Sequence, residues 1–133
     1  MRLISSNVIL NFLTRGEGAD KCLALFKKLS LDGTEAITTE AVIVKVINIL
    51  SGDKFELSPE EIRGKMTPIL ALEGLRLRHK RRILLALDIW VKYKVLDFTD
   101  ALVVAYMKRD EINEIYSYDK DFDQLPQIKR IEP

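Results

Sequence analysis

The chain is poor in the residues that build disulfide frameworks and histidine-based active sites. Its 133 residues include one cysteine, Cys22, and one histidine, His79. A single cysteine excludes an internal disulfide. Because no signal peptide is visible either, we expect a reducing, cytoplasmic setting. His79 lies among charged residues and no Ser-His-Asp arrangement is visible, so we expect a surface residue rather than a catalytic base.

Long apolar runs and an excess of one charge are also missing. The apolar segment at residues 8–13 is interrupted by Asn11 and is too short to span a bilayer, so no membrane association is expected. Twenty-one basic and 20 acidic side chains give a formal net charge of +1, so the overall charge does not indicate nucleic-acid binding. The composition is 47% hydrophobic and 31% charged, which is typical of a globular protein. The length predicts a single domain over residues 1–133.

Short segments typical of strands alternate with helical segments along the chain. Strands are expected at residues 2–5, 36–38, 75–78, 114–117 and 128–131. Helices are expected at residues 6–13, 22–29, 40–50, 81–93 and 97–109, and from residue 58, where Pro68 must kink or end the helix. This alternation predicts right-handed crossovers and a three-layer α/β/α fold with a short-stranded central parallel sheet. Sites in such sheets lie at the carboxyl ends of the strands.

Residues 96–106 combine a helix start with two carboxylates. Asp97 is a suitable N-cap and Asp100 lies in the first turn, where carboxylates meet free N–H groups and the positive end of the helix dipole. The helix that follows is almost entirely apolar. A carboxylate at the start of such a helix suits a plain cap and a metal site equally well, and the residues alone leave both open.

A short basic run is the one local concentration of charge. Positive side chains at a helix start work against the helix dipole, so another interaction would have to favour them. They either form a solvated surface or contact RNA phosphates or an acidic partner. The candidate RNA-binding residues are Arg76, Arg78, Lys80, Arg81 and Arg82.

Three motifs, in this order, resemble the PIN domain family, and in particular the small VapC-type toxins. Residues 97–101 read Asp-Phe-Thr-Asp-Ala, and residues 117–122 read Ser-Tyr-Asp-Lys-Asp-Phe, close to the family's Thr-x-Asp-x-Asp-Phe. Residues 4–10 read Ile-Ser-Ser-Asn-Val-Ile-Leu, close to its opening Asp-x-Asn-Val-Ile-Leu. The resemblance covers nearly the whole chain.

The resemblance implies a metal-dependent ribonuclease. Clustered carboxylates in such enzymes hold Mg²⁺ or Mn²⁺, which orients and activates a water for phosphodiester hydrolysis. On the matching positions, Asp100 and Asp119 are the implied catalytic and metal-binding residues. Asp121 and Asp97 are further candidates for the metal, and Asn7 is expected to cap the first helix and to shape the site.

Two acidic positions of the family pattern are replaced. The opening Asp falls on Ser5, and the Glu expected in the third helix falls on Lys45, the only charge inside the apolar segment at residues 41–50. An ammonium group facing a divalent cation in a partly dry site costs several kcal/mol. We therefore expect metal binding to be lost or much weakened, and Lys45 to take the place of the metal by pairing with Asp100, Asp119 or both.

Two functional interpretations follow. The first is a degenerate PIN domain that acts by binding RNA or a protein. The second is an active Mg²⁺- or Mn²⁺-dependent endoribonuclease, the toxin of a toxin–antitoxin pair, that uses the remaining carboxylates. The resemblance also implies an antitoxin-like partner and a homodimer, with residues 58–72 contributing to the dimer face. Replacements engineered to silence a toxin would give the same sequence.

Overall fold

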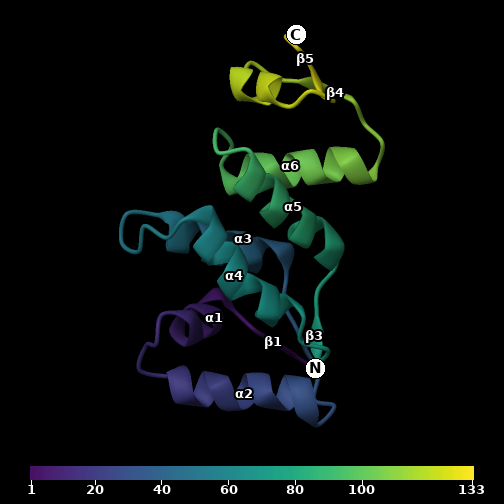
Figure 1. The fold of residues 1–133 in the computed structure, drawn as a ribbon. Helices are drawn as coiled ribbons and strands as arrows, with labels where there is room; N and C mark the ends of the chain where they lie inside the picture. The colour runs from purple at the N-terminus through teal and green to yellow at the C-terminus, as the bar shows by residue number, and fades with distance from the viewer. The chain divides into compact units, whose positions relative to one another are not determined.

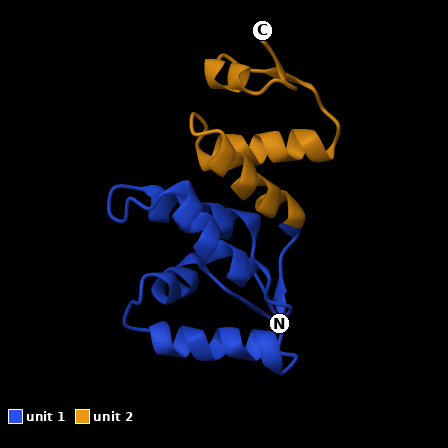
Figure 2. Ribbon diagram, viewed as in Figure 1, with its two compact units in different colours: residues 1–80 blue, residues 81–133 orange.

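The structure is a computed structural model that describes residues 1–133, and the chain divides into two compact units. Unit 1 is Met1–Lys80 and unit 2 is Arg81–Pro133 (Figure 2). Each unit has its own helices and its own parallel sheet, and each is described separately below.

Unit 1 contains a three-stranded parallel sheet and four helices (Figure 1). The sheet order is β1-β2-β3, with Ala36 paired to Arg2 on one side and to Leu75 on the other. Two helices follow β1 and two follow β2, as parallel strands require long crossover connections. The elements are β1 (Arg2–Leu3), α1 (Ser6–Leu13), α2 (Ala19–Leu31), β2 (Ala36–Ile37), α3 (Glu40–Ser51), α4 (Pro59–Leu70) and β3 (Leu75–Arg76).

Unit 2 contains two long helices and a two-stranded parallel sheet. Its elements are α5 (Lys80–Lys92), which begins at the last residue of unit 1, α6 (Phe98–Arg109), β4 (Glu114–Tyr116), the 3₁₀ helix η1 (Lys120–Gln124) and β5 (Lys129–Ile131). The predicted α/β fold with short parallel strands is confirmed. The five strands belong to two sheets, however, rather than to the one central sheet that we expected.

Local sequence accounts for where several helices begin. Ser58 caps α4 in a capping box with Glu61, with Pro59 at the first helical position, as the sequence predicts. Thr39 caps α3 by accepting a hydrogen bond from the Val42 amide at 3.2 Å. Pro68 lies inside α4, which ends two residues later at Leu70. These starts satisfy N–H groups that the helices themselves leave free.

The buried faces of the helices are apolar. Helix α3 buries Ile43, Val46, Ile47 and Leu50, whereas Lys45 is exposed. In unit 2, the Trp90 ring of α5 meets the Phe98 ring of α6 edge to face, with 5.5 Å between ring centroids. None of the helices has the length and apolar content needed to cross a bilayer.

Candidate functional site

The start of α6 places two carboxylates side by side in unit 2. Asp97 is the N-cap in extended backbone conformation, and its Oδ1 accepts a hydrogen bond from the Asp100 amide at 2.8 Å. The predicted cap is therefore confirmed. Asp100 is half-buried in the first turn of α6, directly before the buried residues Ala101 and Leu102.

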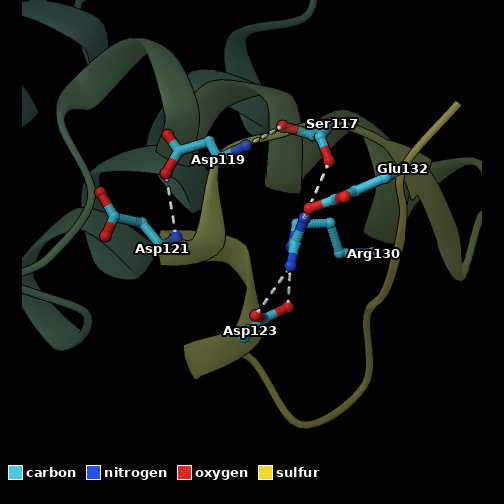
Figure 3. A network of polar contacts seen from close by, with 6 residues as sticks. All are labelled: Ser117, Asp119, Asp121, Asp123, Arg130 and Glu132. Atoms are coloured by element: carbon cyan, nitrogen blue, oxygen red, sulfur yellow. Dashed lines mark hydrogen bonds and ion pairs between the residues drawn. The ribbon is translucent and has the colours of Figure 1, made fainter.

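The loop after β4 carries two further carboxylates (Figure 3). The Asp119 amide donates to Ser117 Oγ at 2.9 Å, and the Asp121 amide donates to Asp119 Oδ1 at 2.9 Å. Asp119 is the N-cap of η1, and Phe122 in that turn is buried. Short hydrogen bonds between side chains and nearby backbone thus define the loop locally.

The carboxylates at the start of α6 and in the loop after β4 influence one another electrostatically. Burial, followed by the nearby carboxylates of Asp97 and Asp119, raises the pKa of Asp100 to about 6. Loss of hydration, followed by the nearby Asp119 carboxylate, also raises the pKa of Asp121. Unit 2 thus brings Asp97, Asp100, Asp119 and Asp121 within electrostatic reach, and ionising all of them together is unfavourable.

The chemistry of these residues suits a hard divalent cation, but their arrangement does not complete a site. Mg²⁺ and Mn²⁺ prefer oxygen ligands, and each carboxylate supplies them. Neither unit, however, contains a group of three or more His, Cys, Asp or Glu side chains arranged to hold a metal ion.

The other motif residues belong to unit 1. Ser5 is the N-cap residue of α1 in extended conformation, and its hydroxyl donates to Asn7 Oδ1 at 2.6 Å. The expectation that Asn7 caps α1 is wrong, because Asn7 lies inside the first turn and its side-chain oxygen accepts from Ser5 instead. Lys45 is exposed on α3, and its pairing with Asp100 or Asp119 stays a prediction.

Three members of the basic run are bound within their own unit. Arg76 pairs with Glu35 at 2.6 Å, Lys80 Nζ donates to the Leu75 carbonyl at 2.9 Å, and Arg82 pairs with Asp110 at 3.1 Å. The other two members are exposed, namely Arg78 and Arg81. Contact of this run with RNA stays a prediction. Because Arg78 and Arg81 are exposed, the prediction rests mainly on these two arginines.

Sequence reasoning missed a network at the C-terminus. Arg130 on β5 forms a two-point ion pair with Asp123, with Nε–Oδ1 at 3.0 Å and Nη2–Oδ2 at 3.3 Å. Its Nη1 contacts Glu132 Oε1 at 2.8 Å and the Ser117 carbonyl at 3.1 Å (Figure 3). The available signal was an arginine in a short strand shortly after an acidic loop.

An Asp100→Asn substitution is expected to stabilise the protein at pH 7.5 but not below pH 4. Asp100 keeps its proton up to about pH 6 in the folded chain but only up to 3.8 at its ordinary pKa. Folding therefore favours the protonated form of Asp100. The folded chain is not penalised by this carboxyl group below pH 4, and it loses free energy of unfolding as the pH rises through 6. Because much of the side chain reaches water, we expect a gain of about 1 kcal/mol at pH 7.5.

Urea unfolding of the native chain and this variant at pH 4, 6 and 7.5 measures the effect. An equal change in unfolding free energy at all three pH values would contradict repulsion as its cause.

Comparison with known proteins agrees with the motifs. The model of the PIN domain family matches residues 3–128, which include parts of both units. A VapC ribonuclease of Mycobacterium bovis and ribonuclease VapC13 of Mycobacterium tuberculosis are each 28% identical over 107 residues, covering 77% of this chain and 77% of each relative.

Among solved structures, Mycobacterium tuberculosis VapC20, described as a Sarcin-Ricin loop cleaving toxin, aligns over 100% of both chains with 14% identity and a TM-score of 0.41. The family assignment rests on the sequence match, which spans nearly the whole chain. The chain belongs to the PIN domain family.

Proposed function

We propose that this chain is a VapC-like PIN-domain protein with an impaired metal site, which acts by binding RNA or a protein rather than by cutting RNA. The observation that carries the proposal is the pair of replaced acidic positions, Ser5 and Lys45. In the family pattern both positions are acidic, so the chain has lost two oxygen ligands and gained an ammonium group.

The mutual repulsion of the carboxylates in unit 2 indicates that they need a nearby positive charge when they are ionised. The pKa of Asp100 is raised to about 6, and the charged groups of unit 2 that act on it are the carboxylates of Asp97 and Asp119. The ionised cluster therefore requires a counter-charge, which is a metal ion in active members of the family. In this chain we assign that role to Lys45, paired with Asp100, Asp119 or both, and no metal is then required.

The alternative function is an active endoribonuclease that depends on Mg²⁺ or Mn²⁺ and is the toxin of a toxin–antitoxin pair. Retention of Asp97, Asp100, Asp119 and Asp121 favours it, as does the ribonuclease activity in the names of the relatives. A carboxylate that supplies the missing ligand would be needed in place of Lys45.

A protein partner is part of both interpretations. We place the chain in the cytoplasm, with an antitoxin-like partner and a homodimer whose face includes residues 58–72. An apolar recess of about 220 Å³ on unit 1 supports a protein contact there, because Pro68, Ile69 and Leu72 line it together with residues of α1 and α2.

The proposal is tested by measuring RNA binding to the native chain by fluorescence anisotropy, first in EDTA and then in Mn²⁺. We expect binding without metal, weakening as salt rises, and uncut RNA on a gel after incubation with Mn²⁺. An Arg78→Gln/Arg81→Gln variant is expected to bind about 3- to 10-fold more weakly, because these exposed arginines are free to contact phosphates.

A Lys21→Gln/Lys27→Gln variant on α2 removes the same charge elsewhere and is the matched control. Metal-dependent cleavage by the native chain would overturn the proposal in favour of the active toxin. RNA binding that does not respond to salt would contradict phosphate contact.

A further inference from the structure

The Arg130 side chain contacts three residues of unit 2, and none of the functions above uses these contacts. Its guanidinium contacts Asp123, Glu132 and the Ser117 carbonyl, and the side chain is only 12% exposed (Figure 3). The carboxylates of Asp123 and Glu132 beside it raise the pKa of Arg130, so it stays charged at any working pH.

These contacts enclose the loop that carries two carboxylates of the candidate site. Ser117 lies at the start of the loop and Asp123 lies in η1 beyond Asp121, so Arg130 is bound on both sides of Asp119 and Asp121. The Ser117 residue whose carbonyl accepts from Arg130 also accepts, through its hydroxyl, from the Asp119 amide. Arg130 thus connects to Asp119 through one residue.

The geometry requires an arginine rather than any cation. A planar guanidinium presents five donors in a fixed fork, which allows a two-point pair with one carboxylate and further bonds from the remaining N–H groups. Lysine has the charge but cannot bind Asp123 at two points while also contacting Ser117. If only positive charge were needed, lysine would serve equally well. Replacing Arg130 by lysine therefore distinguishes a charge role from a positioning role.

We propose that Arg130 is a positioning residue that fixes the loop carrying Asp119 and Asp121 by holding Ser117 and Asp123. The inference rests on the proposed function for the purpose of that loop, which is to present its carboxylates to a cation, whether a metal or Lys45. The contacts on which it depends all lie within unit 2, and the positioning role does not require that the protein cuts RNA.

Amide exchange with solvent, measured by NMR on metal-free protein without RNA, tests the positioning role. In Arg130→Met, which keeps the apolar stem, we expect exchange at the amides of Asp119 and Asp121 to accelerate by about 10-fold. Arg130→Lys is expected to be intermediate. The Ala101 amide, which donates to the Asp97 carbonyl in α6, is the internal reference and should not change.

Arg76→Met removes an arginine paired with a carboxylate in unit 1, Glu35, and is the matched control, with no change expected at Asp119 or Asp121. If Arg130→Met does not fold, Asp123→Asn removes the exposed partner of the fork instead and should accelerate the same two amides. Unchanged exchange at these amides, or equal acceleration at Ala101, would overturn the positioning role.

Mn²⁺ affinity separates this inference from the proposed function. In a Ser5→Asp/Lys45→Glu background, adding Arg130→Met is expected to weaken Mn²⁺ binding by about 10- to 100-fold, as found for groups that orient metal ligands. Absence of Mn²⁺ binding in that background would count against the proposed function, while the amide exchange would still decide the role of Arg130. Mn²⁺ affinity that does not change when Arg130→Met is added to that background would contradict the positioning role.

Discussion

A Ser5→Asp/Lys45→Glu variant is expected to cut RNA in Mn²⁺ at least about 100-fold faster than the native chain. The two substitutions restore the carboxylates of the family pattern and remove an ammonium group that repels a divalent cation. A 100-fold gain corresponds to about 2.7 kcal/mol of barrier, which is less than the several kcal/mol expected from removing one like charge at close range. Cleavage of a mixed RNA pool, followed on a gel, measures the gain.

Three controls identify the source of any cleavage. EDTA should stop it, because the activity depends on the metal. A Ser5→Asn/Lys45→Gln variant removes the ammonium without adding carboxylates, and it should gain less than the Ser5→Asp/Lys45→Glu variant because it lacks the added oxygen ligands. Adding Asp100→Asn to the double variant should abolish the gain. Metal-dependent cleavage by the native chain at the rate of the double variant would show that the remaining carboxylates suffice.

A Phe98→Ala substitution is expected to lower the free energy of unfolding by about 3 to 5 kcal/mol, the usual cost of emptying a buried aromatic position. Phe98 is 1% exposed and packs edge to face against Trp90. It is the first residue of α6, directly after Asp97 and two residues before Asp100. The same residue that fills the core of unit 2 therefore holds the start of the helix that carries both carboxylates.

Urea denaturation of Phe98→Ala beside Val103→Ala measures this cost. Val103 lies on the same helix but is 38% exposed, so the control should lose less than about 1 kcal/mol. A similar loss in both variants would mean that the Phe98 ring contributes helix propensity rather than packing.

Features set by neighbouring residues were predictable from the sequence. The caps at Asp97 and Ser58 depend on a side chain and an amide three residues away, so the pattern is readable in the chain itself. The helix at α3 was less obvious, because its β-branched residues favour a strand. Its length decided the prediction, and the structure confirms a helix over Glu40–Ser51.

Features set by choices between competing partners were not predictable. Asn7 and Ser5 are both good capping residues, and the structure uses Ser5 at the N-cap while Asn7 accepts from its hydroxyl. The pairing of Arg130 with Asp123 and Ser117 depends on β5 returning to lie beside β4. The division of the strands into two sheets depends equally on long-range pairing, which local patterns do not encode.

The most direct test of the central claim is Mn²⁺ binding, measured by electron paramagnetic resonance on the native chain beside the Ser5→Asp/Lys45→Glu variant. If Ser5 and Lys45 have removed the metal, the native chain shows no saturable binding, whereas the variant binds Mn²⁺ saturably and loses it on Asp100→Asn substitution. Saturable binding by the native chain that disappears with Asp100→Asn would contradict the claim and would establish that the retained carboxylates still hold a metal.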